Sequence, residues 1–333
     1  MSLIFVLAGT LGAQSAIVPL AIELKVTSGS DFGRELRHFF PTALFTEYLS
    51  ATAIAEAGKP YWVPTEAEVN ARTFLPRESI LLNSDILAFY GHPRSKNMGI
   101  LGRYTKEELN EKLTALAAEY QEAGGRPVRK AFYIIFGTVW PEGNIGIIQE
   151  SILREYIEFA MENDLLIFID HQIGRFTPLE GLNRMLPWLK YPNVHLALDP
   201  EWRTTKPMEE IGTVSAEELN QVQRVMENYM IENRIPGERL LVIHQFNWRM
   251  ISSRDKVKSD FSRVRLVHCA DGFGPPAMKK TAYANNAQAP NIPIKGFKLF
   301  YNFGIPGAGY DHPLMSPKDV FDLNPRPYIV MYQ

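Results

Sequence analysis

Two carboxylates stand two positions apart at the end of an apolar run, and they are the first sign of chemistry in this sequence. The stretch HLALDPEW places Asp199 and Glu201 on either side of Pro200. Alternate side chains of an extended strand share one face, so Asp199 and Glu201 would point the same way with their Cα atoms roughly 6.6 Å apart. Acids that close compete for protons, and the drier one has its pKa raised, as a general acid requires.

Other polar residues close apolar runs in the same manner. Asp170 ends LLIFID and Asp271 follows VRLVHCA, so both are candidates for the base or nucleophile that would work with Glu201 as proton donor. Asp199 would then tune Glu201. Lys298 lies inside the apolar run GFKLFY, where a solvated lysine is out of place, and we predict that it is the counter-ion of one of these carboxylates or holds substrate.

The candidates for substrate binding share a position at or just beyond the end of an apolar run. They are Tyr90, His92, Trp140, Gln172, Trp202, His244, Gln245, Lys298 and Tyr301. Trp140 and Trp202, together with Trp248, have apolar ring faces and one N–H each, which suits stacking on the C–H faces of sugar rings. Packing of these rings against loops is the structural alternative.

A divalent metal is an alternative use of the same region. Neutral imidazole and carboxylate suit zinc or manganese. The residues that could supply such ligands are His92, His171, His244, Asp170, Asp199 and Glu201. No HxH pattern occurs on the first strand and no Asp closes the last one, so the pattern of the metal-dependent amidohydrolases is missing. We therefore expect no cofactor.

Eight apolar runs, most of them separated by helical patterns, would position these residues. They are residues 85–93, 128–140, 165–174, 194–202, 239–248, 264–273, 294–304 and 327–333. This alternation favours parallel pairing through βαβ units, and closure at eight strands gives a (βα)8 TIM-type barrel over residues 85–333. An open doubly wound sheet is the alternative, but no GxGxxG pattern follows the first strand. Active sites of such barrels lie at the C-terminal ends of the strands.

The last run ends the chain, so the barrel would lack its eighth helix. We expect residues 17–84 to form a linker and an N-terminal helical extension, in which the helical pattern of residues 41–58 could cover the last strand. Residues 1–16 are a candidate signal peptide. Their apolar run is followed by the small residues Ala13 and Ser15, although no Lys or Arg precedes it. This predicts an exported protein, with a cytoplasmic one as the alternative.

Composition narrows the classes of partner. The 333 residues carry a formal net charge of −2 and no long basic run, which disfavours nucleic acid. Beyond the N-terminus, no segment is apolar for long enough to predict a transmembrane helix. Cys269 is the only cysteine, so an internal disulfide and a cysteine-rich zinc site are excluded. The expected partner is a glycan or another small molecule.

Two resemblances bear on function. The Asp-x-Glu that closes the fourth run resembles the arrangement in chitinase-type glycoside hydrolases, where the Glu is the acid and the Asp orients substrate or acid; the longer glycine- and Asp-rich motif of that family is absent. From about residue 86 to residue 333 the chain resembles an uncharacterised family of exported bacterial proteins, often described as lipoproteins. That resemblance rests on YGHPRSKNMGILG, HLALDPEW, VIHQFNW, DGFGPP and MYQ. It implies no known activity, and the lipobox cysteine is missing.

The sequence therefore predicts a barrel hydrolase that resembles glycoside hydrolases and works by general acid/base catalysis with carboxylates at the barrel mouth. A metal-dependent hydrolase of phosphate or amide bonds is one alternative. The other is a barrel that binds carbohydrate without turning it over.

Overall fold

The computed structural model describes residues 2–10, 17–25 and 79–333. The first two segments, β1 (Ser2–Thr10) and β2 (Ile17–Lys25), pair antiparallel as a separate two-stranded sheet. Residues 13–16, with the predicted cleavage site, and residues 41–58, the predicted helix, lie outside the described residues. Among the described residues, no helix combines the length and the apolar character that crossing a membrane requires.

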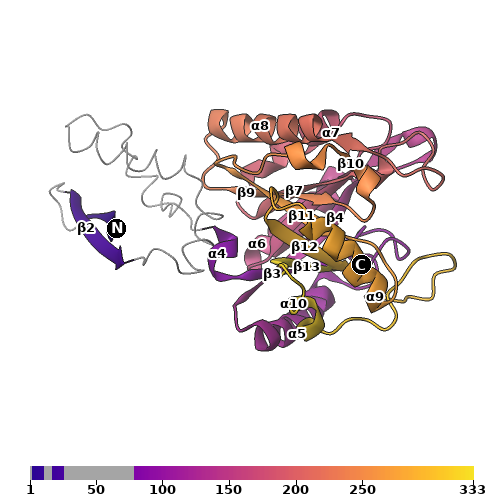
Figure 1. Ribbon diagram of the computed structural model, residues 1–333, viewed down its shortest axis with the longest axis horizontal. Coiled ribbons are helices and arrows are strands. Elements are labelled where there is room, and N and C mark those ends of the chain that lie inside the picture. The colour runs from indigo at the N-terminus through magenta and orange to yellow at the C-terminus, as the bar shows by residue number, and fades with distance from the viewer. Residues whose placement is uncertain (1, 11–16, 26–78) are drawn as a thin grey trace.

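Eight parallel strands close into a barrel, which confirms the predicted fold (Figure 1). Each strand pairs with its neighbour around the ring. The first strand closes the ring, because it pairs in parallel with both the last strand and the second. In chain order the strands are β3 (Asp85–Gly91), β4 (Val128–Val139), β6 (Leu166–Gln172), β7 (Val194–Asp199), β9 (Arg239–His244), β11 (Val264–Ala270), β12 (Ile294–Leu299) and β13 (Ile329–Tyr332). A short strand, β5 (Ile145–Ile147), adds antiparallel to the end of β4.

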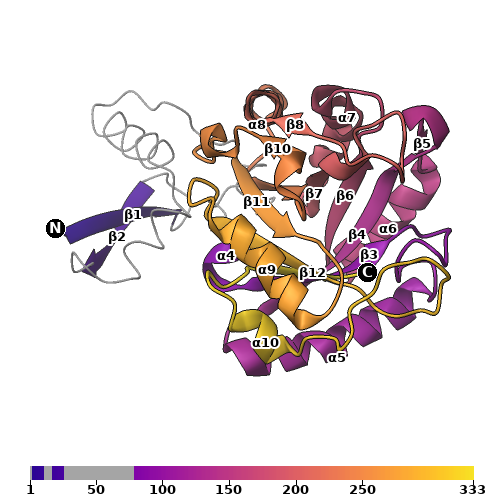
Figure 2. The same cartoon turned by 45° about the vertical axis from the view of Figure 1, so that its right-hand side comes forward.

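Helices cover the outside of the barrel (Figure 2). They are α4 (Ile80–Asn83), α5 (Lys106–Gly124), α6 (Glu150–Glu162), α7 (Pro178–Met185), α8 (Ala216–Glu232), α9 (Pro276–Ala287) and α10 (Pro317–Phe321). The predicted capping box of α5, formed by Thr105 and Glu108, is present, and Gly125 ends that helix in the left-handed conformation.

The connection from β9 to β11 departs from this alternation, because it contains no α-helix. Two 3-10 turns, η4 (Trp248–Met250) and η5 (Arg254–Lys256), occupy it together with the short strand β10 (Ile251–Ser252). Strand β10 pairs in parallel with β8 (Val214–Ser215), which precedes α8. This side of the barrel is therefore held by loop contacts rather than by a helix.

Alternation along each strand separates two apolar layers. On β7, Leu196 and Leu198 belong to the layer between strands and helices, whereas Ala197 belongs to the barrel interior. The same parity directs Asp199 into the interior, as the sequence predicts. The side chains that end the strands on this parity therefore meet at the C-terminal opening of the barrel, which we call the mouth.

The outer face of β13 is covered without an eighth helix. The hydroxyls of Tyr332 on β13 and Tyr120 on α5 lie 2.8 Å apart, and Phe321 of α10 meets the Tyr120 ring edge-on at 5.2 Å. Helices α5 and α10 therefore supply the apolar partner that the last strand needs.

Closure of the barrel can be tested by removing its last strand. Deleting residues 328–333 should give insoluble protein, because β12 and β3 would each lose their ladder with β13 and expose an unpaired edge. Solubility and the cooperativity of thermal unfolding measure the outcome, with deletion of Gln333 alone as the control. A soluble truncation that unfolds cooperatively would contradict the closed barrel.

Candidate active site

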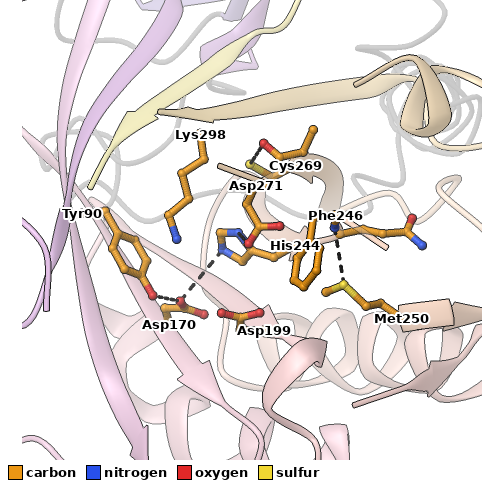
Figure 3. A network of polar contacts seen from close by, with 12 residues as sticks. Tyr90, Asp170, Asp199, His244, Phe246, Met250, Cys269, Asp271 and Lys298 are labelled. Carbon is orange, nitrogen blue, oxygen red and sulfur yellow. Dashed lines mark hydrogen bonds and ion pairs between the residues drawn. The ribbon is translucent and has the colours of Figure 1, made fainter. Parts of the chain in front are cut away.

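Six strands bring ionisable side chains together at the mouth (Figure 3). Each of these residues ends its strand, lies inside it or follows it directly, and its side chain faces the interior. The residues are Tyr90 of β3, Asp170 of β6, Asp199 of β7, His244 of β9, Asp271 after β11 and Lys298 of β12, all of them buried. Five of the six are carboxylates or potential cations, so this is the most charged part of the barrel interior.

Asp170 is completely buried and has few partners. The Tyr90 hydroxyl donates a hydrogen bond to its Oδ2 at 2.9 Å, and His244 Nε2 lies 3.9 Å from the same oxygen. The Lys298 ammonium lies over the Tyr90 ring, 3.7 Å from its centre. Burial raises the pKa of Asp170, although His244 and Lys298 oppose the shift. Its other oxygen, Oδ1, has no hydrogen-bond partner in the protein.

His244 and Asp271 form an ion pair. His244 Nδ1 lies 3.3 Å from Asp271 Oδ2, and His244 Nε2 lies 2.8 Å from the Tyr133 hydroxyl. Burial by itself would lower the pKa of His244, but Asp271, Cys269 and Asp170 outweigh it and raise that pKa well above its usual value. Burial likewise works against ionised Asp271, yet His244 and Lys298 keep its pKa below the usual value. The pair is therefore an imidazolium and a carboxylate at neutral pH.

Asp199 and Glu201 form the second part of the cluster. Strand β7 ends at Asp199, and Glu201 belongs to the 3-10 turn η3 (Pro200–Trp202). The predicted strand, residues 194–202, was thus three residues too long, because Pro200 has a fixed φ and no N–H and begins the turn. Trp202 Nε1 donates a hydrogen bond to Asp199 Oδ2 at 3.1 Å.

The pKa values of both carboxyls are raised, that of Glu201 more strongly. Burial raises the pKa of Asp199 to about 7, and the neighbouring Asp170 and Asp271 add to the shift. Burial also raises the pKa of Glu201 well above its usual value, with further contributions from Asp199 and Asp271. The raised pKa of Glu201, which is partly exposed, and the lowered pKa of Asp271, which is buried, are the pattern of a general acid and a general base or nucleophile.

Several other predicted substrate residues are engaged with the protein. Gln172 accepts a hydrogen bond from the Val139 N–H at 2.8 Å and so ties β6 to β4. Gln245 accepts hydrogen bonds from Arg254 and pairs with His268, and Tyr301 stacks on Tyr332 in the outer layer. Gln245 and Tyr301 stand an odd number of positions after the interior-facing His244 and Lys298, so they face the helices, not the mouth.

The remaining predicted residues lie at the rim. His92 is partly buried and accepts a hydrogen bond from the Arg94 N–H at 3.1 Å. The Trp140 side chain is 58% exposed and borders a surface hollow of about 410 Å³ on the loop between β4 and β5. Trp202, which hydrogen-bonds Asp199, is partly buried. Of the predicted tryptophans, Trp202 is the one that contacts the carboxylate cluster.

The set of possible metal ligands is not assembled. His171 follows Asp170 by one position and so faces outward, where its ring lies against Gly137 and Gly181. In the part of the chain from residue 79 to residue 333, no three His, Cys, Asp or Glu side chains form a group that could hold a metal ion.

One residue of the cluster was not anticipated from the sequence. Tyr133 faces the interior of β4 between Ala131 and Ile135, and its hydroxyl meets His244. From Ala131 onward the run AFYIIF is apolar on both faces, so its composition does not distinguish this tyrosine from a core residue. The available signal was its pairing: Tyr133 lies opposite Tyr90 on the adjacent strand, and both side chains face the interior.

Comparison with known proteins does not assign the chain to a family. No protein-family model matches the chain, and no curated protein matches its sequence. Among solved structures it is similar to a chitinase from Chromobacterium violaceum, at 9% identity and a TM-score of 0.39 over 64% of this chain and 68% of that one. It is also similar to 2,3-dimethylmalate lyase, at 12% identity and a TM-score of 0.43 over 81% of each chain. A broad-specificity endoglucanase from Clostridum cellulovorans, at 10% identity and a TM-score of 0.41, covers 75% of this chain and 84% of its own. Likeness at this level carries no information about activity.

The raised pKa of Asp199 predicts a pH-dependent cost in stability. Between its usual pKa and about 7, unfolded protein loses this proton while folded protein keeps it, so the contribution of Asp199 to stability falls as pH rises through that window. Asp199→Asn, which can still accept the Trp202 hydrogen bond, should gain stability relative to wild type from pH 4 to pH 7, by up to about 4 kcal/mol. The gain should stay constant above pH 7.

Urea unfolding measured across that pH range checks this prediction. Asp319→Asn is the matched control, since hydrogen bonds from Ser316 lower the pKa of Asp319 below its usual value. The stability that Asp319 contributes is already complete above that usual value, so this variant should differ from wild type by a nearly constant amount across the range. An Asp199→Asn variant whose stability runs parallel to wild type at every pH would contradict the raised pKa.

Proposed function

We propose that the protein is a hydrolase of the glycoside-hydrolase kind, with Glu201 as the proton donor and Asp271 as the base or nucleophile. The observation behind this proposal is that acids from three strands meet around His244 at the mouth, where the pKa of Glu201 is raised and that of Asp271 is lowered. Cleavage of a glycosidic bond requires such a pair, an acid for the leaving oxygen and a carboxylate for the other side of the sugar. The substrate is then a glycan or a small glycoside.

The contacts of the two candidates for base or nucleophile favour Asp271. Asp170 has a raised pKa and already accepts the hydrogen bond of Tyr90, so a smaller fraction of it is ionised and free to act as base. Asp271 is held ionised by His244, and its Oδ1 is buried without a hydrogen-bond partner in the protein. Asp271 is therefore the one with a charged, unoccupied oxygen to offer a substrate or a water molecule.

The remaining residues of the cluster receive supporting roles. Asp199 keeps the proton on Glu201 by its nearby charge. Lys298 offsets the negative charge of the ionised acids, Asp271 above all, and lies over Tyr90. Trp202 fixes Asp199 and offers its ring to a sugar. Export of the protein is a further proposal, which rests on the apolar N-terminal run.

Glu201→Gln tests the proton donor. The amide keeps shape and hydrogen bonding but has no proton to give, so kcat should fall by about 10²–10⁴-fold with folding intact. The loss should be much smaller on a dinitrophenyl glycoside, whose leaving group departs without protonation. Initial rates on a panel of natural glycans and aryl glycosides measure this.

Glu210→Gln is the control, because Glu210 lies on the same loop but is exposed and paired with Lys206. Near-normal turnover of Glu201→Gln on a poor leaving group would contradict the assignment. Wild-type protein that binds sugars of the panel without cleaving any would instead identify a carbohydrate-binding barrel. Loss of activity on chelation would favour the metal-dependent alternative.

The pH–rate profile tests the coupling of Asp199 to Glu201. Removing the Asp199 charge removes one of the causes that raise the pKa of Glu201, so Asp199→Asn should move the basic limb of kcat/KM to lower pH. The acidic limb, set by the base, should move less. A basic limb that stays in place in Asp199→Asn would show that another group donates the proton.

A further inference from the structure

Exposed aromatic side chains gather at one end of the barrel. Among residues 79–333, every aromatic residue that is more than about a third exposed follows a barrel strand at its C-terminal end. These residues are Tyr104, Trp140, Trp248, Phe273 and Tyr310. Met161 and Ile231, at the C-terminal ends of α6 and α8 and thus at the opposite end of the barrel, are aliphatic.

Trp248 is displayed on an anchored turn. Its side chain is 72% exposed, yet Met250 in the same 3-10 turn is completely buried, and the Met250 sulfur accepts a hydrogen bond from the Phe246 N–H at 3.4 Å. The Asn247 side chain accepts a hydrogen bond from the Arg249 N–H at 3.0 Å and caps the turn. The backbone that carries the indole is therefore fixed, and the Arg249 guanidinium lies 5.2 Å from the ring centre. A flat ligand that stacks on the exposed indole has little further backbone to order.

Phe273 is fixed in a similar way on the neighbouring loop. It stands two residues after Asp271, is 55% exposed and meets Phe300 edge-on at 6.0 Å. The adjacent Gly274 N–H donates to Asp311 Oδ1 at 3.0 Å, and Asp311 forms a buried ion pair with Lys279 at 3.1 Å. The loop that carries the ring is therefore tied to α9 and to the segment after β12.

We propose that Trp248 and Phe273 form a sugar-stacking subsite at the rim above β9 and β11, beside the cleavage site. They follow His244 and Asp271 by four and two positions on the loops after two paired strands, which places both loops at the rim on the side of the barrel that carries these two cluster residues. Apolar ring faces recognise the C–H faces of pyranose rings. Resting on the function proposed above, this makes the substrate an oligosaccharide or polysaccharide that extends from the cluster onto the rim.

Calorimetric titration of the Glu201→Gln protein, which binds without turnover, tests this inference. The probes are hexasaccharides of β-1,4-linked glucose, N-acetylglucosamine, xylose and mannose, with the 4-nitrophenyl monosaccharides as short counterparts. Adding Trp248→Ala should weaken hexasaccharide binding by about 5–10-fold, or about 1–1.4 kcal/mol, and should weaken the monosaccharide far less. Adding Trp248→Phe should restore most of the affinity.

Ile231→Ala is the matched control, because Ile231 is exposed but lies at the end of the barrel opposite the mouth. This variant should leave both affinities unchanged. Equal affinity of the Trp248→Ala and control proteins for the hexasaccharides overturns the subsite, as does an equal loss on short and long probes. If wild-type protein nevertheless cleaves glycans and Glu201→Gln does not, only the subsite has failed. Absence of both binding and cleavage for every probe overturns the subsite and the proposed function together.

Discussion

The interaction on which the rest of the site depends is the ion pair between His244 and Asp271 inside the barrel. A carboxylate removed from water is strongly disfavoured unless a charge of opposite sign and hydrogen bonds accompany it. His244 lies 3.3 Å from Asp271 and 3.9 Å from Asp170, and so serves two acids from different strands. Tyr133 of β4 contacts the same imidazole across the interior, although β6 and β7 lie between β4 and β9 in the sheet, so the contacts of His244 depend on the curvature of the sheet into a barrel.

The same interaction explains why four acids in one cluster differ in behaviour. Asp271 is next to the imidazolium and its pKa falls, whereas Glu201 stands on the turn after β7 and meets the charges of Asp199 and Asp271. Burial disfavours the ionised form of both acids, but the imidazolium of His244 lowers the pKa of Asp271, whereas neighbouring carboxylates raise that of Glu201 further. Separated values are what acid and base catalysis by chemically similar groups requires. The cost is a folded state that tolerates buried, incompletely paired carboxyl oxygens.

Most of the fold could be predicted from the sequence, because apolar runs, capping residues and Gly stops recur in a regular order. The catalytic candidates were also accessible, since Asp170, Asp199 and Asp271 each end an apolar run. The sequence did not show which residues next to these candidates point into the barrel and which point outward. Gln245 and His171 adjoin interior residues, and a shift of one position on a strand reverses the side chain. Tyr133 failed for the converse reason, because its run is apolar on both faces.

Gln245 shows what such a residue does when it faces outward. Its carbonyl oxygen accepts hydrogen bonds from Arg254 and His268, and Lys295 lies 3.3 Å from the other nitrogen of that histidine. Asn286 of α9 donates to the Gln245 backbone carbonyl at 3.0 Å. These contacts fill the space where the connection from β9 to β11 lacks a helix. They fix the backbone directly after His244, and so they hold the imidazole in place between Asp170 and Asp271 from the outside of the barrel.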